Sequence, residues 1–204
     1  MLNVGYLEMI IGPMFSGKTT MLLEIYRKAK YCNSTVFVIN HSIDKRYSND
    51  KVVNHNKEGI PCTNYEKIKD FIDFIKNKNN ECLKNNNTVI LINEGQFFPD
   101  IKSGVITLVE HFKFKVYVCG LDGDYERNPF GNFLELIPYS DKISKLNSLC
   151  IICKDGTEAA FTHRKLNSDN DNGNQIMVGS HELYLPVCRK CYINSRNFDN
   201  TDNR

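Results

Sequence analysis

The chain has 204 residues, of which 41% are hydrophobic and 25% charged, a composition typical of one soluble globular domain or of one domain with a small appendage. No apolar run approaches the roughly 18 residues that a membrane span needs, and the first residues lack the basic stretch and cleavage site of a secretory signal, so we expect a cytoplasmic protein without membrane contact. A formal net charge of +2 is too balanced to indicate a nucleic-acid partner.

Up to about residue 145, short apolar runs alternate with amphipathic stretches. In chain order, the pattern predicts a strand at 7–11, a helix at 18–31, a strand at 35–39, a mobile excursion or hairpin over 41–64, a helix at 65–76, a loop at 77–87, a strand at 88–92, a helix at 101–112 and a strand at 115–119. This alternation predicts the α/β class, with a parallel sheet covered by helices on both faces.

The first turn between strand and helix carries a phosphate-binding motif. Residues 12–19 read Gly-Pro-Met-Phe-Ser-Gly-Lys-Thr and fit the P-loop pattern G-x-x-x-x-G-K-[ST] in full, with a strand before and a helix after. The ATP-binding residues predicted from it are Gly12, Pro13, Met14, Phe15, Ser16, Gly17, Lys18 and Thr19. Lys18 is expected to reach the β- and γ-phosphates and the Thr19 hydroxyl to ligate Mg²⁺, so the fold is predicted to be P-loop NTPase-like, with ATP and Mg²⁺ as ligands.

The strand at 88–92 is followed by Asn93 and Glu94. Ligands of open α/β sheets bind beyond the carboxyl ends of the strands, so Glu94 is a candidate magnesium-shell group or general base. A capping or solvent-exposed glutamate is the alternative.

Eight cysteines without an export signal do not indicate disulfides. Four of them form two C-x-x-C pairs, Cys150 with Cys153 and Cys188 with Cys191, whereas Cys32, Cys62, Cys82 and Cys119 are scattered and read as plain thiols. Two such pairs supply the four-sulfur shell that zinc prefers, and because all four positions are filled, the zinc is expected to be structural.

These features predict three parts along the chain. Residues 1–146 form the nucleotide-binding domain, 147–193 a small zinc-ribbon subdomain with a long inserted loop, and 194–204 a disordered tail.

Together the motifs resemble the type II thymidine kinases, the zinc-containing family of animals, bacteria and large DNA viruses. The resemblance runs from Tyr6 to about Tyr192, and the CRKCYINS ending is most similar to poxvirus members. The segments that carry it are GPMFSGKT, DKRYS, NEGQFFPDI, GLDGDYERNPFG, EAAFTHRK, the VG-x4-Y of residues 178–184 and CRKCYINS.

The resemblance implies transfer of the γ-phosphoryl group of ATP to the 5′-hydroxyl of thymidine, with deoxyuridine also accepted. It implies that Glu94 is the general base, that Arg46 clamps the transferred group and that a lasso-like lid closes over thymine. The substrate-binding residues it implies are Met14, Phe97, Leu121, Tyr125, Phe130, Thr162, Gln175, Ile176, Met177, Val178, Gly179 and Tyr184. It also implies a homotetramer and feedback inhibition by thymidine triphosphate.

Five positions depart from the family pattern, and of these Leu185 and Pro186 carry no predicted effect. Asn93 replaces an aspartate in the magnesium shell, where its amide oxygen can still accept a hydrogen bond from a bound water, and Asp124 and Tyr125 replace threonine and phenylalanine. Weaker magnesium binding and an altered nucleoside preference are the expected effects. The alternatives are a zinc-containing P-loop ATPase acting on nucleic acid, a catalytically weakened homologue, and a kinase for another nucleoside or for nucleoside monophosphates.

Overall fold

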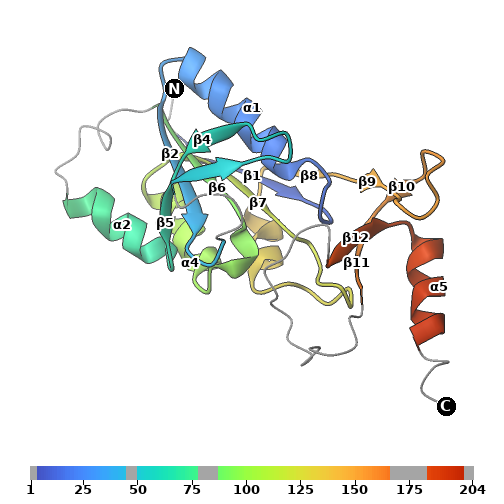
Figure 1. The fold of residues 1–204 in the computed structure, drawn as a ribbon. Coiled ribbons are helices and arrows are strands. Elements are labelled where there is room, and N and C mark those ends of the chain that lie inside the picture. Colours follow the sequence, from blue (N-terminus) through green and yellow to red (C-terminus); the bar gives the residue numbers. More distant parts are fainter. Residues whose placement is uncertain (1–3, 45–49, 78–86, 166–182, 200–204) are drawn as a thin grey trace.

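The computed structural model describes residues 4–44, 50–77, 87–165 and 183–199 (Figure 1). Arg46 and the segment 175–179, both predicted to contact substrate, lie outside these ranges. Within the described ranges, no helix has the length and apolar character needed to cross a membrane.

A six-stranded sheet with the order β5-β2-β6-β7-β1-β8 forms the centre of the molecule, and every neighbouring pair in it is parallel. Its strands are β1 (Tyr6–Ile11), β2 (Thr35–His41), β5 (Thr63–Tyr65), β6 (Thr88–Ile92), β7 (Lys115–Gly120) and β8 (Lys142–Lys145). The predicted α/β class with a parallel sheet is confirmed.

Both faces of the sheet are covered, which explains why its inner strands are continuous apolar runs. On one face, Ile10, Val38 and Leu91 pack with α1 (Lys18–Tyr31) and with the antiparallel hairpin of β3 (Lys51–Val53) and β4 (Gly59–Pro61). On the other face, Met9 and Ile90 pack with α2 (Ile68–Asn77), α4 (Ile101–Ile106) and the 3₁₀ segment η3 (Phe133–Tyr139).

Several predicted elements differ from those observed. The polar stretch 41–64, predicted as a mobile excursion or a hairpin, contains the hairpin of β3 and β4. Strand β5 then joins the main sheet, so the helix predicted from residue 65 begins at Ile68. The helix predicted over 101–112 changes at Thr107 into a π-helical turn, η2 (Thr107–His111). Strand β8 was not predicted; it is short and largely exposed, and only its pairing with β1 places it in the sheet.

The cysteine pairs lie in a separate small body at the end of the molecule farthest from α2 (Figure 1). It consists of β9 (Ser148–Leu149) with β10 (Glu158–Ala159), β11 (Phe161–Arg164) with β12 (Tyr184–Val187), and α5 (Arg189–Asp199). Its core contains the cysteines themselves together with Ala159, Val187 and Tyr192. The last helix, α5, extends to Asp199, into the segment 194–204 for which the sequence predicted a tail.

Candidate active site and cysteine cluster

The glycine-rich turn, residues 12–17, connects β1 to α1 at the carboxyl end of the sheet. Gly12 is required because a Cβ there would overlap the carbonyl oxygen of Leu146, and Gly17 caps α1 with a left-handed φ of 83°. The Lys18 ammonium folds back over the turn and donates to the Pro13 carbonyl at 2.6 Å and to Ser16 Oγ at 3.3 Å. With no acidic residue in its first turn, α1 presents an uncompensated positive end to an anion.

Glu94 is the second residue after β6 and adopts a left-handed conformation with φ 53°. Such a backbone is costly for a residue with a Cβ, and strain of this kind occurs preferentially at functional sites. Gln96 Nε2 donates to Glu94 Oε2 at 2.6 Å, and Gln96 Oε1 accepts from the backbone N–H of Leu121 at 3.0 Å. The buried Gln96 side chain therefore fixes both the carboxylate and the start of the segment after β7.

Asn93 takes part in a buried row of polar side chains at the ends of three adjacent strands. Its Nδ2 donates to Asn40 Oδ1 at 2.9 Å, and Cys119 Sγ donates to its Oδ1 at 3.1 Å. Asn93 is 3% exposed. Its predicted place in a magnesium shell therefore competes with two hydrogen bonds inside the protein, whereas Thr19, the second residue of α1, is only half-buried.

Aromatic rings gather beyond Glu94. The Phe97 ring lies 5.6 Å from Phe130 and 5.9 Å from His41 between centroids. Phe97 is half-buried and Phe130 buried, so Phe97 retains exposed ring surface against which a flat ligand can stack. Burial lowers the pKa of His41, which favours the neutral imidazole beside these rings.

Thr162, a predicted pocket residue, and Arg164, the register partner of the predicted Tyr184, connect the small body to the rest of the molecule. Thr162 on β11 accepts a hydrogen bond from the backbone N–H of Met14 at 3.0 Å, which brings the glycine-rich turn against β11. Tyr184 on β12 pairs in register with Arg164, whose guanidinium carbon lies 5.0 Å from the centroid of the Tyr125 ring.

Asp124 has a local role in the turn that carries Tyr125. Its carboxylate accepts hydrogen bonds from the backbone N–H groups of Glu126 and Asn128, at 2.9 and 2.8 Å. This aspartate therefore shapes the turn 124–128, and its effect on nucleoside preference, if measured, is expected to act through the position of Tyr125.

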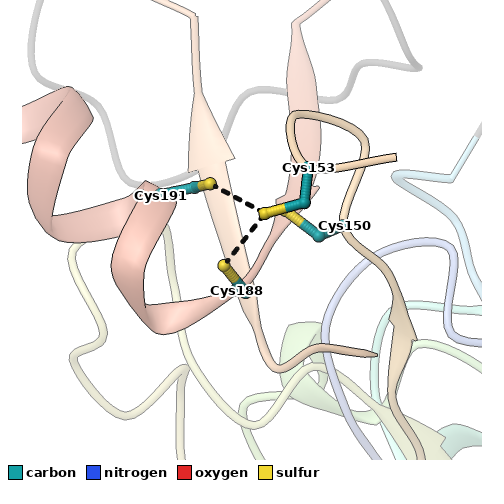
Figure 2. A group of neighbouring side chains, drawn as sticks. All are labelled: Cys150, Cys153, Cys188 and Cys191. Carbon is teal, nitrogen blue, oxygen red and sulfur yellow. Dashed lines mark hydrogen bonds between the residues drawn. The ribbon is translucent and has the colours of Figure 1, made fainter. Parts of the chain in front are cut away.

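The four paired cysteines converge on one point (Figure 2). All four sulfur atoms lie within 4.8 Å of one another, and Cys153 Sγ is 3.7 Å from Cys188 Sγ and 3.4 Å from Cys191 Sγ. A tetrahedral zinc with Zn–S bonds of about 2.3 Å places its sulfurs about 3.8 Å apart, so the cluster has the donor set and size for zinc. Burial opposes ionisation of Cys150, but hydrogen bonds from backbone N–H groups outweigh it and lower the pKa of this thiol to about 6.

Sequence reasoning assigned no role to Gln96, Asn40 or Tyr192. Gln96 stands two residues from Glu94 within NEGQFFPDI, and Tyr192 follows the last cysteine, so both were visible within motifs already recognised. Asn40 had no such signal, because only the pairing of β2 with β6 brings it beside Asn93.

The fold and the cysteine cluster thus define an α/β protein with a six-stranded parallel sheet and an attached site that can hold a structural zinc. The family described as thymidine kinase matches residues 5–192. The chain belongs to the thymidine kinase family.

Three relatives illustrate the match. The thymidine kinase of Choristoneura fumiferana entomopoxvirus is 38% identical, covering 91% of this chain and 95% of the viral protein. The thymidine kinase of Bacteroides thetaiotaomicron is 33% identical, covering 96% of this chain and 90% of the bacterial one. The thymidine kinase of vaccinia virus (strain Western Reserve) is 36% identical, covering 95% of this chain and all of the viral protein.

Proposed function

We propose that this protein transfers the γ-phosphoryl group of ATP to the 5′-hydroxyl of thymidine, forming thymidine monophosphate for DNA synthesis. Membership of the thymidine kinase family supports the reaction. The observation that carries the assignment of residues is the bridge made by Gln96, which joins Glu94 to the backbone of Leu121. A proposed base and a proposed pocket wall are thereby held by one buried side chain.

In the proposed reaction, Glu94 accepts the proton of the 5′-hydroxyl while the oxygen of that hydroxyl forms a bond to the γ-phosphorus. The bond from that phosphorus to the β–γ bridging oxygen breaks, and ADP leaves. Phosphoryl transfer depends on alignment and charge stabilisation more than on covalent chemistry. The glycine-rich turn and Lys18 would hold the triphosphate, for which Lys18 must exchange its contact with the Pro13 carbonyl for phosphate oxygens.

Magnesium bound together with ATP would neutralise part of the negative charge on the phosphates. The Thr19 hydroxyl would bind this ion directly. Asn93 would bind a water of the magnesium shell, and its amide oxygen would then accept from that water and from Cys119 together. Arg46, outside the described residues, is proposed to clamp the transferred group.

The nucleoside would lie against Phe97, Tyr125 and Phe130. Met14, Leu121 and Thr162 would line the base pocket, and 175–179 with Tyr184 would form the lid. Excluding water from this site would protect ATP from hydrolysis. Zinc at the four cysteines would hold the small body that carries Thr162 and Tyr184.

Three finer properties are proposed on family membership alone: a homotetramer, feedback inhibition by thymidine triphosphate and a cytoplasmic location. Sedimentation velocity and inhibition by added thymidine triphosphate test the first two.

The function is tested by incubating the purified zinc-loaded protein with ATP and Mg²⁺ and with thymidine, deoxyuridine, deoxycytidine or deoxyguanosine in parallel. Turnover of thymidine and deoxyuridine is expected, and Glu94→Gln should lower kcat by about 10²- to 10⁴-fold. The matched control is Glu24→Gln, on the exposed side of α1, which should keep full activity. ATP hydrolysis stimulated by DNA, without nucleoside phosphorylation, would replace the proposal with the ATPase reading.

A further inference from the structure

Tyr192 connects the cysteine cluster to the segment that carries Tyr125. It follows Cys191 directly in α5, and its side chain is fully buried, with 0% exposure. Its hydroxyl donates to the backbone carbonyl of Tyr125 at 2.7 Å. A residue adjacent to a predicted zinc ligand thus holds the main chain of a predicted substrate-binding residue.

The Tyr192 ring makes a second connection to the same segment. The guanidinium carbon of Arg127 lies 4.5 Å from the Tyr192 centroid and 5.7 Å from that of Phe161. Phe161 in turn packs 5.5 Å from Tyr192, and Arg189 lies over its ring at 4.8 Å. Residues 125 and 127 are therefore both held on the surface formed by Tyr192 and Phe161, by a hydrogen bond and by cation–π contacts.

Hydrogen bonds close the segment that carries these two anchors into a turn. Arg127 N–H donates to the Asp124 carbonyl, Asp124 N–H donates to the Asn128 carbonyl, both at 3.0 Å, and the Asp124 carboxylate accepts from two more backbone N–H groups. Since the turn is closed on itself, a shift at Tyr192 is expected to displace the Tyr125 ring rather than to be absorbed locally.

We propose that Tyr192 is a positioning residue that couples the metal-bound state of the cysteine cluster to the placement of Tyr125 at the thymidine site. This inference rests on the proposed function only in naming thymidine as the substrate, because the coupling itself is argued from the contacts of Tyr192. When the cluster is loaded, Cys191 and hence the first turn of α5 are fixed, and the Tyr192 hydroxyl holds the turn 124–128 in register with the pocket. When the metal is lost, that restraint is lost with it.

Tyr192→Phe tests the coupling, because it keeps the ring and removes only the hydroxyl. The KM for thymidine should rise about threefold to tenfold, the range expected for losing one buried hydrogen bond, with kcat and the KM for ATP nearly unchanged. Zinc content should stay at one per chain. The matched control is Tyr31→Phe, at the end of α1 and 90% exposed, which should behave as wild type.

Hydrogen exchange provides a readout that needs no catalysis. In Tyr192→Phe, amides of 121–131 should exchange faster while those of β6 do not change, and stripping zinc from the wild type should accelerate the same amides. Unchanged exchange in both cases would overturn the coupling, as would a rise in KM accompanied by loss of zinc. If no nucleoside is turned over, faster exchange in both cases would still support the coupling, and the failure would belong to the proposed function.

Discussion

Asn93 shows how one side chain can be constrained by its neighbours on two strands. The register of β2, β6 and β7 pairs Ile39 with Ile92 and Ile92 with Val118, so the next residues along, Asn40, Asn93 and Cys119, lie in a row. An amide suits the middle of this row, because it donates to one side and accepts from the other. A carboxylate there would have to receive a hydrogen bond from both.

Asn93→Asp is expected to fold, since the Asn40 amide can rotate to donate and Cys119 can still donate. Burial of the new charge should cost about 1–3 kcal/mol of unfolding free energy in the absence of ligand. The added charge, at a position predicted to belong to the magnesium shell, should lower the Mg²⁺ concentration for half-maximal rate several-fold. Urea unfolding and magnesium titration of the rate measure the two effects. Asn40→Asp, with the same charge one strand away, is the control, and an unchanged magnesium dependence in Asn93→Asp would refute a role near the metal.

Gln96 offers a sharper test, because its two hydrogen bonds connect different parts of the site. Gln96→Met keeps the volume but releases Glu94 and leaves the Leu121 N–H without its partner, so kcat should fall at least tenfold and stability by about 1–3 kcal/mol. Gln96→Glu should be worse for kcat, because it sets a carboxylate against a carboxylate. Steady-state kinetics and thermal unfolding of both variants check this, and wild-type kcat in both would show that the bridge is not needed.

The sequence predicted elements well where burial on both faces imposed a continuous apolar run. Strand 88–92 agrees with β6 at both ends for this reason, and helix 18–31, predicted instead from apolar residues at helical spacing, agrees with α1 at both ends. Strands β5 and β8 could not be found this way, since TNY and KISK are short, partly polar and exposed, and their place depends on pairing with β2 and β1.

In the candidate site, too, features set by local spacing were predicted and features set by contacts between distant residues were not. The glycine-rich turn and the cysteine quartet are local spacings, and the structure brings the four cysteines together as the spacing predicted. The contacts of Asn40 with Asn93 and of Tyr192 with Tyr125 join residues far apart in the chain, so they depend on strand register and packing, which a single sequence does not state.

Strand β8 is held to β1 partly by the carboxylate of Glu8. This buried side chain accepts hydrogen bonds from Ser144 at 2.7 Å, Lys142 at 2.9 Å and Tyr6 at 3.1 Å. Burial alone would raise the pKa of Glu8, but these partners outweigh it and hold the pKa below its ordinary value of 4.5. A depressed folded-state pKa contributes stability that is present above the unfolded value and is lost as the pH falls toward the folded one.

Wild-type stability should therefore decline as the pH drops below 4.5, and Glu8→Gln should flatten this decline while lowering stability at neutral pH. Urea unfolding between about pH 3 and pH 7 measures both slopes. Glu24→Gln, on the exposed side of α1, should leave the wild-type slope intact. Parallel pH profiles for wild type and Glu8→Gln would contradict this role for Glu8.

The molecule combines a large body and a small one, and only the large one has an extensive apolar core. The sheet has a large apolar cluster on each face, whereas the described part of the small body has a core of six buried side chains, three of which are cysteines. Small cores of this kind usually depend on a metal or on disulfides for their stability. Because Thr162 of the small body accepts a hydrogen bond from the backbone of Met14, the folding of the small body also affects the glycine-rich turn.

Loss of the metal is therefore expected to unfold the small body and leave the sheet folded. Cys153→Ser removes the sulfur that lies between Cys188 and Cys191 and should reduce zinc below one per chain, abolish thymidine turnover and expose 148–165 and 183–199 to rapid hydrogen exchange. Protection of β1, β6 and β7 should persist, since their clusters contain none of the four cysteines. Cys32→Ser, at the exposed end of α1, is the matched control and should keep zinc and activity. Full zinc content with normal turnover in Cys153→Ser would show that the small body folds without a four-sulfur site.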